Sequence, residues 1–152
     1  MRNKAGAGSG TVGETLFWGL NMILPLVFGG VLYLLFCPET RLSETAGRFF
    51  AVRGFPTFFS SGSPFLVFLR NYLFDFLWAY SLVFVLSRIL GVFEKRILSV
   101  GLIVFLFASL TELLQLVRLF PGTFDLRDIL TEWTAAAFGL RIQKIYFSIK
   151  KG

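Results

Sequence analysis

Carboxyl groups within long apolar stretches are the side chains of this sequence best suited to chemistry. Asp75, Glu112 and Glu132 interrupt segments that otherwise consist mainly of Leu, Ile, Val, Phe and Ala. An ionised carboxylate that faces lipid at mid-bilayer costs about 2.5–3.5 kcal/mol or more. Each of these acids therefore needs a partner, water or a ligand, and together they could bind a polar headgroup or hold a cation.

Further polar residues lie at helical spacing around these acids. Glu112, Gln115 and Arg118 recur at i, i+3 and i+6, which places them on one stripe of a helix, and Asp125 and Asp128 open the next apolar segment. One hypothesis is a ligand site. The alternative is structural, with Asp125 or Asp128 capping a helix and an ion pair from Arg118 or Arg70 holding the helices together.

Other kinds of chemistry have weaker signals. The sequence has no His, which excludes imidazole bases and histidine metal ligands, and its one cysteine, Cys37, cannot form an internal disulfide. Oxygen ligands for Mg or Ca could come from Asp125, Asp128 and Glu132, but D-x-x-D spacing is common by chance. The Gly-rich N-terminus lacks the Lys-Ser/Thr of a phosphate loop. We therefore expect no catalytic residue, no metal and no cofactor.

The elements that position these residues must be membrane helices. The chain has 152 residues, of which 55% are hydrophobic, and 20 are Phe. So much apolar surface exceeds what one small soluble domain can hide, and the charges lie mostly between long apolar blocks. The net charge of +6 is divided among short connectors, so it favours a membrane protein and not a nucleic-acid-binding one.

The hydrophobic pattern predicts an all-α, polytopic transmembrane bundle of four helices. A flexible N-terminal tail of residues 1–15 precedes a membrane domain of residues 16–147, and a basic tail of residues 148–152 follows it. The connector of residues 37–70 is aromatic and is expected in the headgroup layer on the outside. The four helices are expected at residues 16–36, 71–89, 97–117 and 128–142.

Two features of these helices have mainly structural interpretations. Pro25 lies in the middle of the first helix and is expected to kink it. Thr131, Ala135 and Gly139 form a small-x-x-x-small seam, which allows the fourth helix to approach a neighbour closely.

Charge bias predicts the orientation in the membrane. Nine Lys and Arg residues lie on the side of both termini and of the short connector near Glu94, against six on the other side. The positive-inside rule therefore places both termini in the cytoplasm. With that topology Asp75, Glu112 and Glu132 all fall in the outer leaflet, which predicts a single polar site. Its expected ligand-binding residues are Asp75, Glu112, Gln115, Arg118, Phe124, Asp125, Asp128 and Glu132.

The sequence from Thr111 onward, T-E-L-L-Q-L-V-R-L-F-P-G-T-F-D-L-R-D-I-L, resembles the VanZ-like family of bacterial membrane proteins. That family carries E-x-x-Q on one helix and F-D-x-x-D at the opening of the last. Asp75 and Trp78 lie in a segment similar to another helix of some members. Proline and glycine at positions 121 and 122, where an Arg is usual, and Glu132, where an Asn is usual, indicate a divergent member. The residues that match the motif are Glu112, Gln115, Phe124, Asp125 and Asp128.

The resemblance implies a role in the bacterial cell envelope, because the founding member is associated with teicoplanin resistance. The expected function is binding of a polar headgroup or a lipid-linked envelope precursor at the outer-leaflet acidic cluster, without turnover and without nucleic acid. Two alternatives are a metal-dependent enzyme acting on a lipid-linked phosphate and a structural subunit of a membrane complex. The sequence leaves open a membrane-protein partner or a homo-oligomer.

Overall fold

The computed structural model describes residues 12–36, 45, 47–49, 64–91, 96–119 and 124–151. Long helices make up almost all of this part, and the described residues contain no strand, which confirms the all-α class. Cys37 and nearly all of the connector up to residue 63 lie outside the described residues. The long helices are α1 (Val12–Phe36), α3 (Pro64–Ile89), α4 (Ile97–Leu116) and α5 (Leu126–Lys151).

Three of these helices are long and apolar enough to cross a membrane. The spans are Val12–Leu34, Asn71–Ile89 and Ile97–Leu116, with 23, 19 and 20 residues. Most of their surface is not buried within the protein, as expected where lipid covers it. α5 has 26 residues but is not among the candidate spans, because charged residues recur along it from its first turn to its last. Three helices therefore support the expectation of a helical membrane protein.

The helices extend further than expected at three boundaries. α1 begins at Val12, within the expected tail, and α3 begins at Pro64, so that residues 64–70 are helical and not part of the connector. Asn71, where this helix was expected to begin, lies inside it. Proline suits the first turn of a helix, where its missing N–H has no partner to lose. α5 continues to Lys151 as one helix and does not end at Ile142.

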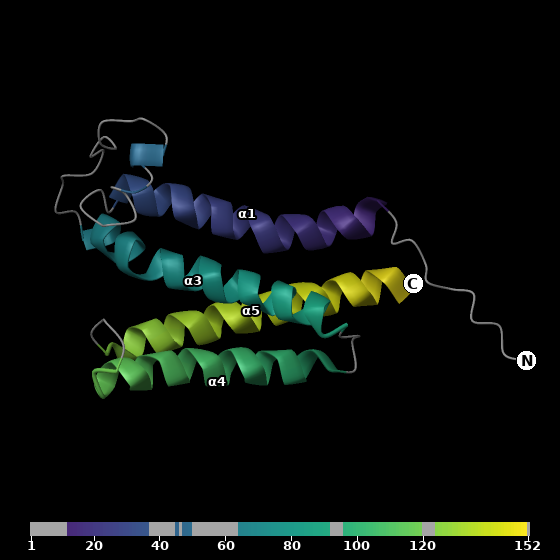
Figure 1. The fold of residues 1–152 in the computed structure, drawn as a ribbon. Coiled ribbons are helices and arrows are strands. Elements are labelled where there is room, and N and C mark those ends of the chain that lie inside the picture. Colours follow the sequence, from purple (N-terminus) through teal and green to yellow (C-terminus); the bar gives the residue numbers. More distant parts are fainter. Residues whose placement is uncertain are drawn as a thin grey trace, which may run out of the picture.

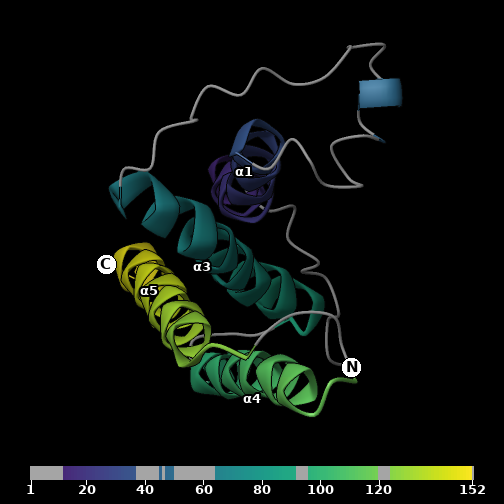
Figure 2. The same cartoon turned by 90° about the vertical axis from the view of Figure 1, so that its left-hand side faces the viewer.

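The four helices lie lengthwise beside one another with α3 in the middle (Figure 1). α1 packs on one side of α3, while α5 and α4 lie on the other side, as the view along the bundle shows (Figure 2). The first residues of α1 and the last of α5 lie at the same end. There Phe17 stacks on Tyr146 with ring centroids 3.9 Å apart, and Lys150 forms a 2.6 Å ion pair with Glu14.

Close contacts between helices depend on small residues. A Cβ added to Gly139 of α5 would lie 3.3 Å from Cβ of Val83 on α3, and Ala135 is fully buried one turn earlier. This confirms the expected tight contact at Ala135 and Gly139. Gly101 of α4 has the same role against α5, since its added Cβ would lie 2.5 Å from Cδ1 of Leu140.

Hydrogen bonds from side chains of α3 join this helix to α1. The Ser81 hydroxyl donates to the Met22 carbonyl at 2.5 Å, and the Tyr80 hydroxyl donates to the Asn21 side chain. Pro25 has no N–H to donate to the carbonyl four residues before it, that of Asn21, and the Ser81 hydroxyl bonds to the neighbouring carbonyl of Met22.

A buried glutamine forms the corresponding link between α3 and α5. Gln143 is fully buried, accepts a 2.9 Å bond from the Ser87 hydroxyl and donates to the Val83 carbonyl at 3.3 Å. A buried amide needs such partners, because an unpaired polar group away from water costs more than the bond is worth.

The turn after α4 contains an arginine in a backbone conformation that favours glycine. Arg118 has φ 58°, its N–H donates to the Gln115 carbonyl at 2.9 Å, and the N–H of Leu119 donates to the Leu114 carbonyl at 2.9 Å. This pair of bonds is the Schellman motif, in which glycine usually occupies the position of Arg118.

Arg118→Gly is therefore expected to stabilise the fold slightly, by about 0.5–1 kcal/mol, because glycine adopts this φ without a Cβ clash. Thermal unfolding in detergent would measure the gain. Arg118→Ala is the control, since it removes the same side chain and keeps the Cβ. Equal stability of both variants would show that the left-handed turn is not strained.

Candidate functional site

Four carboxyl groups from three helices meet at the end of the bundle where α4 ends and α5 begins. Asp75 comes from α3, Glu112 from the last turns of α4, and Asp128 and Glu132 from the first two turns of α5. Each lies close enough to others of the group to interact electrostatically, and Glu132 does so with all three. We call these four residues the acidic cluster.

Two members of the acidic cluster are almost completely buried. Glu112 is 5% exposed and Glu132 is 6% exposed, while Asp75 and Asp128 are half-buried. Among the described residues, no group forms a hydrogen bond with the buried Oε2 of Glu132. An unpaired buried carboxylate oxygen is costly, and it stands in the midst of other acids and not beside a base. The cluster thus has unused hydrogen-bonding capacity in its interior.

Asp125 caps α5 and is not an interior member of the cluster. Its Oδ1 accepts the N–H of Arg127 at 2.9 Å, and its carbonyl accepts the N–H of Asp128 at 3.1 Å, which is the pattern of an N-cap. Its Oδ2 accepts a 3.4 Å bond from the Tyr72 hydroxyl of α3. The capping role considered from the sequence is therefore present at Asp125.

Glu112 links the cluster to this cap. Its Oε2 accepts the backbone N–H of Asp125 at 3.2 Å, so the end of α4 fixes the start of α5. Helical spacing could not predict this bond, because it joins a helix to the loop that follows. Glu112 therefore has a positioning role in addition to its place in the cluster.

The remaining expected site residues lie outside the cluster. Gln115 is half-buried, Arg118 is exposed in the turn after α4, and Phe124 is 39% exposed. Within the part of the chain that the structure describes, Arg118 forms no ion pair with Glu112. The i+6 spacing from Glu112 assumed that α4 continues through Arg118, but the helix ends at Leu116.

Sequence analysis missed Tyr72, which is 8% exposed and reaches the cap of α5. Its position three residues before Asp75 on the same helix was the available signal. Across the described ranges, no three acidic or thiol side chains are close enough together to hold a metal ion. Ionised carboxylates accept hydrogen bonds, so the cluster suits a ligand group that carries N–H or O–H donors.

The three apolar helices and this polar interior indicate a helical integral membrane protein. Comparison of the chain with models of protein families, with curated proteins and with solved structures gave no match.

Proposed function

We propose that this chain is a binding protein of the bacterial cell envelope, and that its acidic cluster holds the polar headgroup of a lipid or of a lipid-linked envelope precursor. The observation that carries the proposal is Glu132, whose Oε2 is buried among other acids and has no hydrogen-bond partner in the described part of the chain. A ligand with an ammonium, hydroxyl or amide N–H group would satisfy this oxygen.

The chemistry of the cluster narrows the ligand class. All four members are acids, so they accept hydrogen bonds when ionised and repel a bare phosphate. Amino groups and sugar or peptide donors of an envelope precursor fit such a site, whereas a phosphate would have to lie elsewhere. The VanZ resemblance on Glu112, Asp125 and Asp128 supports an envelope role, including a link to teicoplanin resistance.

The membrane arrangement is part of the proposal. We place the protein in the cytoplasmic membrane with both termini inside, and α5 as a fourth span packed against α3 and α4. Support comes from the charge bias and from Gly139, whose contact with α3 brings α5 into the bundle. Along α5 the acids Asp128 and Glu132 then face other helices and not lipid, which lowers their cost.

Glu132→Gln and Asp128→Asn are each expected to abolish complementation of a deletion strain, while the level of the protein in the membrane stays unchanged. Both changes keep the shape and remove the charge that would hold a donor-bearing ligand. The measurement compares lipids, muropeptides and teicoplanin susceptibility of a deletion strain complemented with each variant. Glu14→Gln is the matched control, because it makes the same change in an acid at the other end of the bundle.

The result can contradict the proposal in two ways. Full complementation by both cluster variants would show that the charges are dispensable. Loss of both proteins from the membrane, with normal levels of Glu14→Gln, would show that the acids serve folding and not binding.

A further inference from the structure

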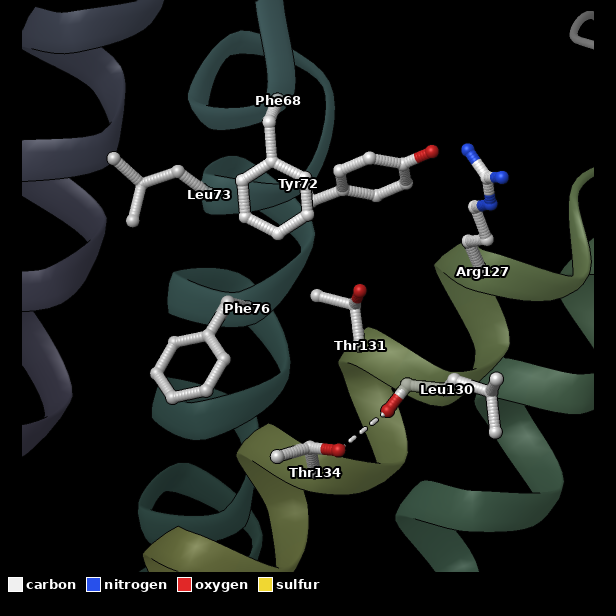
Figure 3. A pocket seen from close by; sticks show the side chains of 8 residues that line it. All are labelled: Phe68, Tyr72, Leu73, Phe76, Arg127, Leu130, Thr131 and Thr134. Atoms are coloured by element: carbon white, nitrogen blue, oxygen red, sulfur yellow. Dashed lines mark hydrogen bonds between the residues drawn. The ribbon is translucent and has the colours of Figure 1, made fainter. Parts of the chain in front are cut away.

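An apolar groove lies between α3 and α5, and its described lining includes none of the four residues of the acidic cluster. It has a volume of about 620 Å³, within the usual range for small-molecule sites. Its lining comes from α3 and α5, with Phe68, Tyr72, Leu73 and Phe76 of the former and Arg127, Leu130, Thr131 and Thr134 of the latter (Figure 3). The groove therefore offers a hydrocarbon chain a continuous apolar surface.

The upper end of the groove carries a cation. Arg127 lies in the first turn of α5, and the Tyr72 hydroxyl points toward its guanidinium group (Figure 3). The nearby acid Asp125 has both carboxylate oxygens engaged, one by the Arg127 backbone N–H and the other by Tyr72. Among the residues described, Arg127 forms no ion pair, although it interacts electrostatically with Tyr72 and Asp125. Its side chain is exposed, so the remaining N–H donors of its guanidinium can reach an anion.

The lower part of the groove offers little to a polar ligand. The Thr134 hydroxyl donates to the Leu130 carbonyl of its own helix at 2.7 Å, so its hydrogen is already used. Charge at one end and hydrocarbon surface along the rest match a molecule with a phosphate at its head and a chain below it.

We propose that the groove between α3 and α5 holds one phospholipid, with its phosphate on Arg127 and an acyl chain against Phe68 and Phe76. This inference goes beyond the function proposed above, because the groove selects an anion whereas the acidic cluster selects donors. It depends on Arg127 and on the walls of the groove, and not on Glu132.

Native mass spectrometry of the full chain in mild detergent tests the proposal. We expect dioleoylphosphatidylglycerol to be retained about tenfold more strongly than dioleoylglycerol, which has the same chains and no phosphate, because a charge-assisted hydrogen bond to phosphate is absent from the latter. Arg127→Gln should remove this preference and leave dioleoylglycerol unchanged. Arg118→Gln is the matched control, since it removes the same charge at the same end of the bundle outside the groove.

Two further variants keep the test decisive. Thr131→Trp should reduce binding of both lipids by filling the groove, with helicity checked by circular dichroism, and Glu132→Gln should leave both unchanged. Equal retention of the two lipids by the unmodified protein would overturn the proposal. An equal loss in Arg118→Gln and Arg127→Gln would also overturn it, because the attraction would then be general. So would loss of phosphatidylglycerol in Glu132→Gln, which would place the lipid at the acidic cluster.

Discussion

Phe84→Ala is expected to destabilise the folded protein by about 3 kcal/mol, the lower end of the usual cost for deleting a buried phenylalanine ring. Phe84 is fully buried on α3. Its ring contacts those of Phe17 and Trp18 on α1, at 5.9 and 5.8 Å between centroids, and that of Tyr80 at 5.0 Å. In a micelle the unfolded chain keeps the ring in apolar surroundings, so the loss comes mainly from contacts and from the cavity.

Unfolding of the purified protein in increasing SDS, followed by tryptophan fluorescence, would measure this loss. Trp18 is a suitable reporter, because it packs against Phe84. Phe28→Ala is the matched control. Phe28 is 52% exposed on α1, so this substitution removes the same ring from the surface that faces lipid. Equal effects of the two substitutions would show that the ring of Phe84 is not part of a packed core.

Gly139→Leu is expected to cost about 1–3 kcal/mol or more, and to separate α5 from α3. The first added carbon alone would lie 3.3 and 3.4 Å from two carbons of Val83 and 3.5 Å from the ring of Phe84. Three further carbons have no space there, because Val83 and Phe84 are themselves fully buried. The helix must therefore move outward, which would also strain the bonds of Gln143 one turn later.

The melting temperature in detergent would show this effect, with Gly30→Leu as the control. Gly30 is exposed on α1, and a Cβ added there meets nothing within 4 Å. The change in helix propensity is the same at both positions, so the difference between the two variants reports the contact. Unchanged melting of Gly139→Leu would mean that α5 does not pack on α3 through this face.

The positions of the helices were predictable where lipid dictates them. α4 was expected at residues 97–117 and extends over Ile97–Leu116, because an uninterrupted apolar segment of this length has few alternatives in a membrane. The expected ends of α1 and α3 at residues 36 and 89 also agree. Hydrophobicity did not reveal where α5 ends, since the Tyr146 ring is held by Phe17, which is remote in the sequence.

The acidic cluster was partly predictable for a similar reason. Counting helical turns from the connectors placed Asp75, Glu112 and Glu132 at one depth, and the structure brings them together. The depth of a residue in the membrane does not show, however, in which direction its side chain points around the helix axis. The unpaired oxygen of Glu132, the bond from Asp125 to Glu112 and the groove beside Arg127 depend on how α3, α4 and α5 are rotated against one another, and that is a property of the packed bundle.

The pairing of the beginning of α1 with the end of α5 has a consequence for biosynthesis. Glu14 and Lys150 are 136 residues apart in the sequence, and Phe17 stacks on Tyr146 beside them. While the ribosome is still translating the later helices, the aromatic face of the first helix has only α3 as a partner. The parts of Phe17 and Trp18 that later contact Tyr146 therefore remain in lipid, which tolerates such rings, until α5 has been translated and completes the bundle.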